Sequence, residues 1–200
     1  MSCKPLLLIA AVVACLSVAQ PASADLIVNG GFETGDYTGW TTVAVNYPYF
    51  LIATSPAFVH SGRHAAEFAG ETGGGGNVLT SDNTLSQTVA TTVGQQYTLS
   101  FYLLSDGATP NNFEATWDTT VLFPFTTDIP AHPYQQYSYT VTGTGSDTVE
   151  FYALDNPGYF YLDDVSLNSA VPEPTGVVAL LGLCGMGLLG MVWRCRRRAA

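Results

Sequence analysis

The residues of this chain that are able to do acid–base chemistry are carboxylates spread along its middle. A glycoside hydrolase needs two carboxyl groups placed across a sugar bond. The glutamates able to supply such a pair are Glu67, Glu71, Glu114 and Glu150. None of them lies in a local motif that would bring a pair together, and scattered acidic residues usually serve solubility. A small glycan hydrolase is therefore the least favoured alternative.

Nucleophiles and metal-binding side chains are equally sparse. Ser61 and His64 are close in sequence, but a catalytic triad is a spatial arrangement, and no nucleophile motif surrounds them or His60 and His132. The cysteines all fall in the hydrophobic end segments, at Cys3, Cys15, Cys184 and Cys195. The middle of the chain has no thiol nucleophile and no thiolate metal site, so we expect no enzyme activity and no catalytic residue.

The charge of the middle segment excludes nucleic acid as a partner. Between Asp25 and Val171 the only Lys or Arg is Arg63, whereas fifteen residues are Asp or Glu. The segment carries about −14 charges, a field that repels phosphate backbones.

The elements that must position these residues are β-strands. Short β-branched and aromatic runs alternate with Gly, Pro, Asn and Asp, and no stretch keeps a helical period. The pattern predicts strands at Leu26–Val28, Thr41–Val45, His64–Phe68, Leu85–Ala90, Gln95–Leu104, Phe113–Thr116, Val121–Phe125, Gln135–Thr142, Thr148–Leu154 and Phe160–Leu167. Ten short strands predict an all-β, two-sheet antiparallel sandwich of the jelly-roll type.

The two-residue period of a strand assigns the faces. The predicted core-facing residues are Tyr97, Leu99, Phe101, Leu103, Phe113, Ala115, Trp117, Val149, Phe151 and Ala153. Trp40 is also expected in the core, because a Trp in a sandwich is more often buried than exposed. Tyr102 and Tyr152 fall on the outward faces, where an aromatic ring could stack on a sugar, and they are the candidate ligand-binding residues.

The N-terminal end has the form of a secretion signal. Lys4 precedes an apolar run from Leu6 to Val18, and Ala22-Ser23-Ala24 supplies the small residues that signal peptidase needs. We expect cleavage before Asp25. Two alternatives are a short membrane anchor, for which the run is brief, and lipoprotein processing at Cys15.

The C-terminal end can span a membrane. Gly176–Trp193 is 18 residues without a charge, which as a helix reaches roughly 27 Å. The arginines Arg194, Arg196, Arg197 and Arg198 follow, and the positive-inside bias places them in the cytoplasm with the domain on the far side. Two prolines in Pro172-Glu173-Pro174 keep the chain before the helix extended.

The order of Pro172-Glu173-Pro174, apolar helix and arginine cluster closely resembles the PEP-CTERM sorting signal. This resemblance implies that an exosortase removes the helix and passes the domain to the outer surface or matrix of an exopolysaccharide-producing Gram-negative cell, by way of an inner-membrane intermediate with the domain in the periplasm. The expected parts are thus a signal peptide at 1–24, a sandwich at 25–170 and a sorting signal at 171–200.

Three further segments resemble the carbohydrate-binding, galactose-binding-like jelly rolls. They are Asn29-Gly30-Gly31-Phe32-Glu33 with Trp40, Ser61-Gly62-Arg63-His64, and Tyr161-Leu162-Asp163-Asp164-Val165. In that family the first and last strands lie near each other and commonly hold a structural calcium ion. The resemblance implies Glu33 and Asp163 as its ligands, with Gly31 and a carbonyl of the Ser61–His64 turn completing the shell and Asp164 competing. The alternative is that Glu33 caps a turn and that Asp163 and Asp164 end a strand in solvent.

These expectations together describe a noncatalytic surface or matrix-associated protein that binds glycan or exopolysaccharide. A structural envelope or matrix protein without a ligand pocket is the alternative from another class.

Overall fold

The computed structural model describes residues 24–43, 50–68, 83–155 and 157–170. Within them the chain forms ten strands. The strands are β1 (Thr41–Val43), β2 (Phe50–Ala53), β3 (Ala65–Phe68), β4 (Asn83–Ala90), β5 (Gln96–Ser105), β6 (Asn111–Trp117), β7 (Thr120–Thr127), β8 (His132–Thr142), β9 (Ser146–Asp155) and β10 (Phe160–Ser169).

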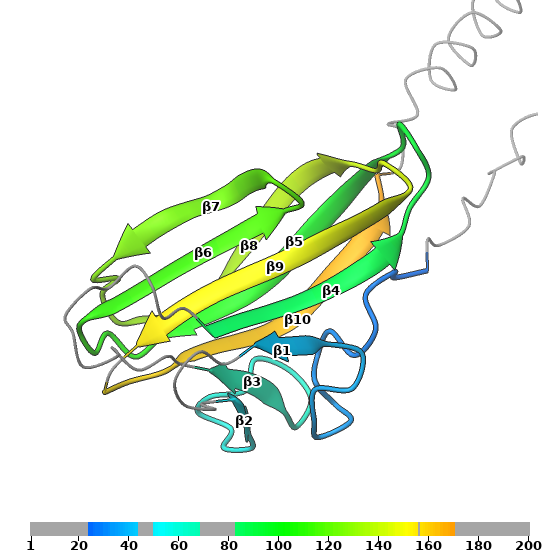
Figure 1. The fold of residues 1–200 in the computed structure, drawn as a ribbon. Coiled ribbons are helices and arrows are strands. Elements are labelled where there is room, and N and C mark those ends of the chain that lie inside the picture. Colours follow the sequence, from blue (N-terminus) through cyan, green and yellow to red (C-terminus); the bar gives the residue numbers. More distant parts are fainter. Residues whose placement is uncertain (1–23, 44–49, 69–82, 156, 171–200) are drawn as a thin grey trace, which may run out of the picture. The chain divides into compact units, whose positions relative to one another are not determined.

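The strands form two five-stranded antiparallel sheets that lie as two layers (Figure 1). The first sheet has the order β1-β4-β9-β6-β7, and the second has the order β2-β3-β10-β5-β8. Neighbours in each sheet are mostly distant in sequence, so the chain crosses repeatedly between the layers. This confirms the all-β sandwich that the strand pattern predicts.

The core between the sheets is built by the alternation that the sequence shows. Along β5 the residues Tyr97, Leu99, Phe101 and Leu103 are buried while the residues between them are half-buried. The predicted inward residues of β6 and β9 are buried as well. Phe101, Phe113 and Phe151 meet at the centre, with ring centroids 5.1 to 6.3 Å apart. Trp40 and Trp117 are in the core, as predicted.

The first predicted strand is wrong. Residues 26–28 form no strand, because the side-chain amide of Gln87 on β4 bonds both main-chain groups of Val28. Gln87 Oε1 accepts from Val28 N at 2.8 Å, and Gln87 Nε2 donates to Val28 O at 2.9 Å. Leu26 N donates to Leu167 O on β10 at 3.0 Å. The segment is therefore bonded to both sheets without joining either ladder.

β2 is a second difference, and the predictions for the chain ends are not tested. β2 was not predicted, because Phe50–Ala53 is a four-residue apolar run without the alternation that marks a strand. None of the described residues belongs to a helix that could cross a membrane. The predicted helix Gly176–Trp193 and the signal segment up to Ser23 lie outside the described residues.

Candidate functional site

A loop of residues 54–64, which we call the 54–64 loop, joins β2 to β3 and packs on the outer face of the second sheet. Tyr161 faces outward there, because Phe160 and Leu162 beside it belong to the main core. The Phe58 ring stacks on Tyr161 with centroids 4.5 Å apart, and Tyr134 on β8 donates its hydroxyl to Phe58 O at 2.9 Å. Aromatic packing thus fixes this loop on the sheet.

Two carboxylates from opposite ends of the domain hold the main chain of the 54–64 loop. Asp163 Oδ2 accepts from the backbone N–H groups of His60 at 2.9 Å and Ser61 at 3.1 Å. Glu33 Oε1 accepts from Arg63 N at 2.8 Å and His64 N at 2.9 Å. We call this arrangement the carboxylate clasp. It joins the opening and closing motifs of the domain through the turn between them.

Asp164 completes the clasp because the chain bulges beside it. The ladder between β10 and β5 shifts register between Asp163 and Ser166, and Asp164 has a φ of 48°. Its carboxylate bonds His60 Nδ1 at 2.7 Å and accepts from Ser61 Oγ at 2.8 Å. Because of the bulge, the successive residues Asp163 and Asp164 both form hydrogen bonds with the same turn.

The opening motif passes close to β10, and this passage explains one of its glycines. A Cβ atom on Gly30 would lie 1.8 Å from Val165 O, while Gly30 O accepts from Val165 N at 3.0 Å. Any side chain at residue 30 would push these two segments apart. Gly30 therefore places Glu33 beside the end of the domain.

The electrostatics of the clasp differ between its two main carboxylates. The backbone N–H groups of Arg63 and His64 hold the pKa of Glu33 below its usual value. Burial raises the pKa of Asp163 to about 6, against the opposing effect of the Ser61 N–H. Asp163 is fully buried, so it does not end its strand in solvent, whereas Glu33 does cap the turn.

The predicted calcium ligands lie together at this clasp. A Cβ atom on Gly31 would be 3.7 Å from Asp163 Oδ1, 3.4 Å from Asp164 Oδ1 and 3.7 Å from Glu33 Cγ. Each main carboxylate already accepts backbone hydrogen bonds. In the part of the chain that the structure describes, no group of three or more His, Cys, Asp or Glu side chains is arranged to hold a metal ion.

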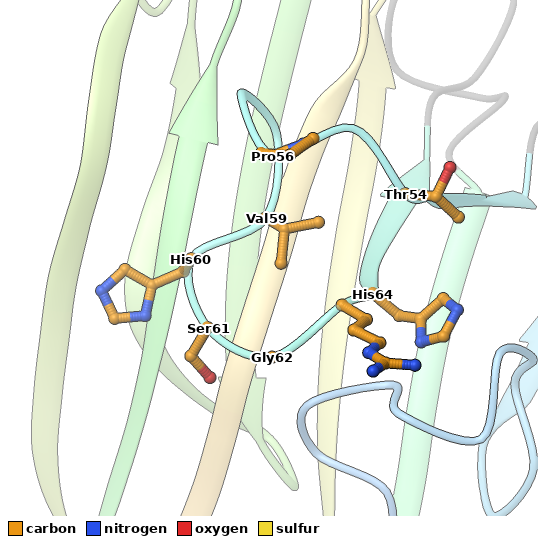
Figure 2. A pocket seen from close by; sticks show the side chains of 8 residues that line it. Thr54, Pro56, Val59, His60, Ser61, Gly62 and His64 are labelled. Carbon is orange, nitrogen blue, oxygen red and sulfur yellow. The ribbon is translucent and has the colours of Figure 1, made fainter.

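A cavity of about 440 Å³ opens within the curve of the 54–64 loop (Figure 2). Its lining includes Thr54, Val59, Arg63 and His64. Arg63, the only Lys or Arg among the described residues, makes no salt bridge with any of them. The cavity lies at the clasp, not on an open face of the sandwich.

The two predicted sugar-contacting tyrosines lie on different sheets. Tyr102, on β5, has one ring face covered by the imidazole of His60, with centroids 3.7 Å apart and planes 20° from parallel. Tyr152 lies on β9, the central strand of the first sheet. The two residues cannot belong to one binding surface.

The outer face around Tyr152 is polar. Across the ladder, Tyr152 is paired with Thr84 on β4 and with Glu114 on β6. Its hydroxyl donates to Glu150 Oε2, two residues earlier on the same strand. An aromatic ring framed by two carboxylates and a hydroxyl is a set of groups able to hold a polyhydroxylated ligand.

The glutamates that could form an acid–base pair are distributed unevenly. Glu114 and Glu150 lie on the same face of adjacent strands, because Glu150 is paired with Thr116, two residues beyond Glu114. Glu67 lies on β3, in the second sheet. Glu71 is outside the described residues.

Sequence reasoning missed His60 and Tyr134, two of the side chains that hold the 54–64 loop on the outer face. His60 directly precedes the Ser61–His64 turn, and that position was the available signal. Of the processing residues, Asp25 is described: its Oδ1 atom accepts from Leu167 N at 2.8 Å. Ala22 and the sorting residues Pro172, Glu173, Pro174, Arg194, Arg196, Arg197 and Arg198 lie outside the described residues, and Ala24 is exposed.

Comparisons with known proteins address the two parts of the chain separately. Residues 170–198 match the family model described as the PEP-CTERM protein-sorting motif. The search of curated proteins returned no significant match.

Three solved structures illustrate the fold that this chain shares. The first is TmCBM61 in complex with β-1,4-galactotriose: it is 16% identical, the match covers 74% of this chain and 100% of that one, and the TM-score is 0.56. The second is the CBM22-1 xylan-binding domain of Xyn10C from Paenibacillus barcinonensis, with 15% identity, coverage of 77% and 99%, and a TM-score of 0.52. The third is the K1 cleaved adhesin domain of Lys-gingipain from Porphyromonas gingivalis W83, with 18% identity, coverage of 70% and 96%, and a TM-score of 0.52.

At these identities the likeness establishes the fold. The chain therefore combines a jelly-roll domain with the fold of carbohydrate-binding modules and a PEP-CTERM protein-sorting motif at residues 170–198.

Proposed function

We propose that this protein is a noncatalytic glycan-binding module that an exosortase displays at the outer surface or in the matrix of a Gram-negative cell. The observation that carries the binding half is Tyr152, an aromatic ring on the outer face of the central strand of a sheet. The fold shared with galactotriose- and xylan-binding modules supports the same half. The sorting motif supports the display half.

The Tyr152 surface fits a sugar better than the surface at Tyr102 does. A pyranose ring binds by placing its C–H face on an aromatic ring while its hydroxyls donate to carboxylates. Tyr152 has Glu150 bonded to its hydroxyl and Glu114 beside it across the ladder. At Tyr102 the imidazole of His60 already occupies a ring face. We therefore assign the glycan to the outer face of the first sheet.

Depletion from solution tests the binding half. The purified protein is mixed with insoluble galactan, xylan, cellulose and exopolysaccharide, and the protein left in the supernatant is measured. Glycan binding predicts depletion by at least one polymer, reversed by soluble fragments of that polymer. A protein that stays in solution with all of them would instead be a structural matrix component.

One observation favours hydrolysis as the second candidate, since Glu114 and Glu150 share the same outer face on adjacent strands. Diagonal neighbours across a ladder are about 7–8 Å apart at their backbones, which is within reach of a carboxylate pair. Release of reducing sugar from the bound polymer, abolished in Glu150→Gln, would establish this activity. The noncatalytic function predicts that no sugar is released.

Mass spectrometry of the protein released from the cell surface tests the display half. Processing by signal peptidase and exosortase predicts a chain that starts at Asp25 and ends near Pro172. Deletion of the exosortase should leave a form that keeps its C-terminal helix and stays with the membrane. An intact C-terminus on the surface protein would contradict this part of the proposal.

We also propose that calcium binds at the carboxylate clasp. Two features support it. Gly31 has no side chain and so leaves room beside Asp163 and Asp164. Burial raises the pKa of Asp163 to about 6, and a bound cation would stabilise its charged form. The melting temperature of EDTA-treated protein should rise on adding CaCl₂, and Glu33→Gln should reduce the rise. An equal rise in that variant would exclude Glu33 as a ligand.

A further inference from the structure

Asp155, at the end of β9, is a buried carboxylate that the functions above do not use. It is 2% exposed. Both of its carboxylate oxygens are buried and neither is in hydrogen-bond geometry with a partner, although the backbone N–H of Gly158 and the side chain of Asp106 act on its charge. A buried carboxylate without a partner is costly, and proteins resolve that cost with a proton, a cationic side chain or a metal ion.

The fold brings a second carboxylate to the same place. Asp106 follows β5, and the pairing of Ser105 with Phe160 sets it beside the turn between β9 and β10. Its Oδ1 atom accepts from Ala108 N and its Oδ2 atom from Tyr159 N, both at 2.9 Å. These bonds fix the orientation of the Asp106 carboxylate, so it is prearranged on the turn that follows Asp155.

The main chain of that turn passes unusually close to Asp106. A Cβ atom on Gly158 would lie 2.5 Å from Asp106 Oδ1, 2.6 Å from Asp106 Oδ2 and 2.6 Å from Ala108 Cβ. Only glycine allows this approach. The turn is thereby held against the Asp106 carboxylate.

The negative charge of Asp106 destabilises the charged form of Asp155. Burial, and then the negative charge of Asp106, raises the pKa of Asp155 to about 7. The ion pairs that the described residues form are those of His60 with Asp164 and of His64 with Glu33. Arg63, the only Lys or Arg in that part of the chain, lies on the 54–64 loop. Among the residues that the structure describes, no cationic side chain is paired with these two carboxylates.

The donor set selects the kind of cation. Carboxylate oxygens are hard ligands, and the pair includes no sulfur or imidazole, which favours calcium over zinc, copper or iron. With two protein carboxylates, the rest of the shell falls to carbonyl oxygens and water. Such a shell suits the weak calcium binding of extracellular modules, whose dissociation constants are about 10⁻⁴ to 10⁻³ M.

We propose that Asp155 and Asp106 bind a calcium ion at the turn between β9 and β10, at a site distinct from the carboxylate clasp. This site would tie the end of the first sheet to the second, because β9 and β10 belong to different sheets. It does not depend on glycan binding or on sorting.

Counting bound ions tests the site directly. The purified full-length protein is freed of metal with EDTA and titrated with Tb³⁺, whose emission the nearby Tyr159 and Tyr161 should sensitise, and with Ca²⁺ in competition. The Asp155→Asn variant should bind one ion fewer than the wild type. Asp163→Asn, the control at the clasp, should leave the ion at Asp155 in place. The loss of one ion in Asp155→Asn relative to the wild type is expected whether or not the clasp itself binds an ion.

Thermal unfolding provides a second readout that does not need tight binding. In EDTA at pH 8, Asp155→Asn should melt at a higher temperature than the wild type, because it removes a buried charge. In about 5–10 mM CaCl₂, roughly ten times the highest expected dissociation constant, the melting temperature of the wild type should rise more than that of the variant. The difference between the two melting temperatures should therefore become smaller. Asp106→Asn provides a second variant if Asp155→Asn does not fold.

Equal ion counts in the wild type and Asp155→Asn, with equal calcium-induced shifts, would overturn the proposal. In that case a proton shared by the two carboxylates would be the remaining way to neutralise Asp155. A wild-type melting temperature that falls as pH rises, by an amount that Asp155→Asn reduces and that calcium does not change, would identify that state.

Discussion

Asp163 Oδ2 lies 2.9 Å from the backbone nitrogen of His60, which precedes it by 103 residues in the chain. Together with Glu33, this contact fixes the 54–64 loop on the outer face of the second sheet. Three motifs that are far apart in the sequence are therefore one structural unit. The clasp is how the opening motif, the central turn and the closing motif are held together in this chain.

Removing the Asp163 carboxylate should release that loop. Asp163→Ala leaves the partly buried N–H groups of His60 and Ser61 without their acceptor. An unsatisfied buried group costs about 1–3 kcal/mol, so urea unfolding should show a loss of about 2 kcal/mol or more. A loss below about 0.5 kcal/mol, the range of ordinary surface substitutions, would show that the loop is held by its aromatic contacts alone.

An alanine at residue 62 should destabilise the protein more than an alanine at residue 94, although both glycines have a left-handed backbone. Gly62 has a φ of +67°, and a Cβ atom there would lie 2.3 Å from Glu33 Oε1. Gly94 has a φ of +78° but nothing within 4 Å of its Cβ position. Both alanine variants pay about 1–2 kcal/mol for the left-handed backbone. Gly62→Ala should lose more than Gly94→Ala in the free energy of unfolding, and equal losses would contradict the close contact with Glu33.

Glu67 should make stability depend on pH. Burial raises its pKa above the usual value of 4.5. The folded chain thus binds this proton more tightly than the unfolded chain does, so its contribution is complete below about pH 4.5 and is lost as the pH rises through the folded pKa. Relative to the wild type, Glu67→Gln should gain stability between pH 4 and pH 7. Urea unfolding at several pH values measures this gain, and a pH-independent difference would refute it.

Much of the fold could be predicted because alternation along a strand is a local property. The inward faces of β5, β6 and β9 follow directly from their two-residue period. Residues 26–28 could not be predicted in this way, since a side chain 59 residues away takes the hydrogen bonds of Val28. The four residues of β2 are too few to show a period.

The sequence indicated which residues would form the candidate site, but not how their side chains would be arranged. The resemblance implied that Gly31, Glu33 and Asp163 meet, and the structure brings them together. It did not indicate that Asp163 would accept a hydrogen bond from the backbone of His60, or that the His60 ring would cover Tyr102. Alternation put Tyr102 and Tyr152 on outward faces, but only the strand order shows that those faces belong to different sheets.

Binding of the purified protein to a glycan array, compared with its Tyr152→Ala, Tyr152→Phe and Gln136→Ala variants, tests the central claim most directly. A glycan site on the outer face of the first sheet predicts that Tyr152→Ala weakens binding by about tenfold or more. Tyr152→Phe, which keeps the ring, should retain most of the affinity, and Gln136→Ala, an exposed change on β8 of the other sheet, should bind like the wild type. Undiminished binding by Tyr152→Ala, or no bound glycan for the wild type, would contradict the account.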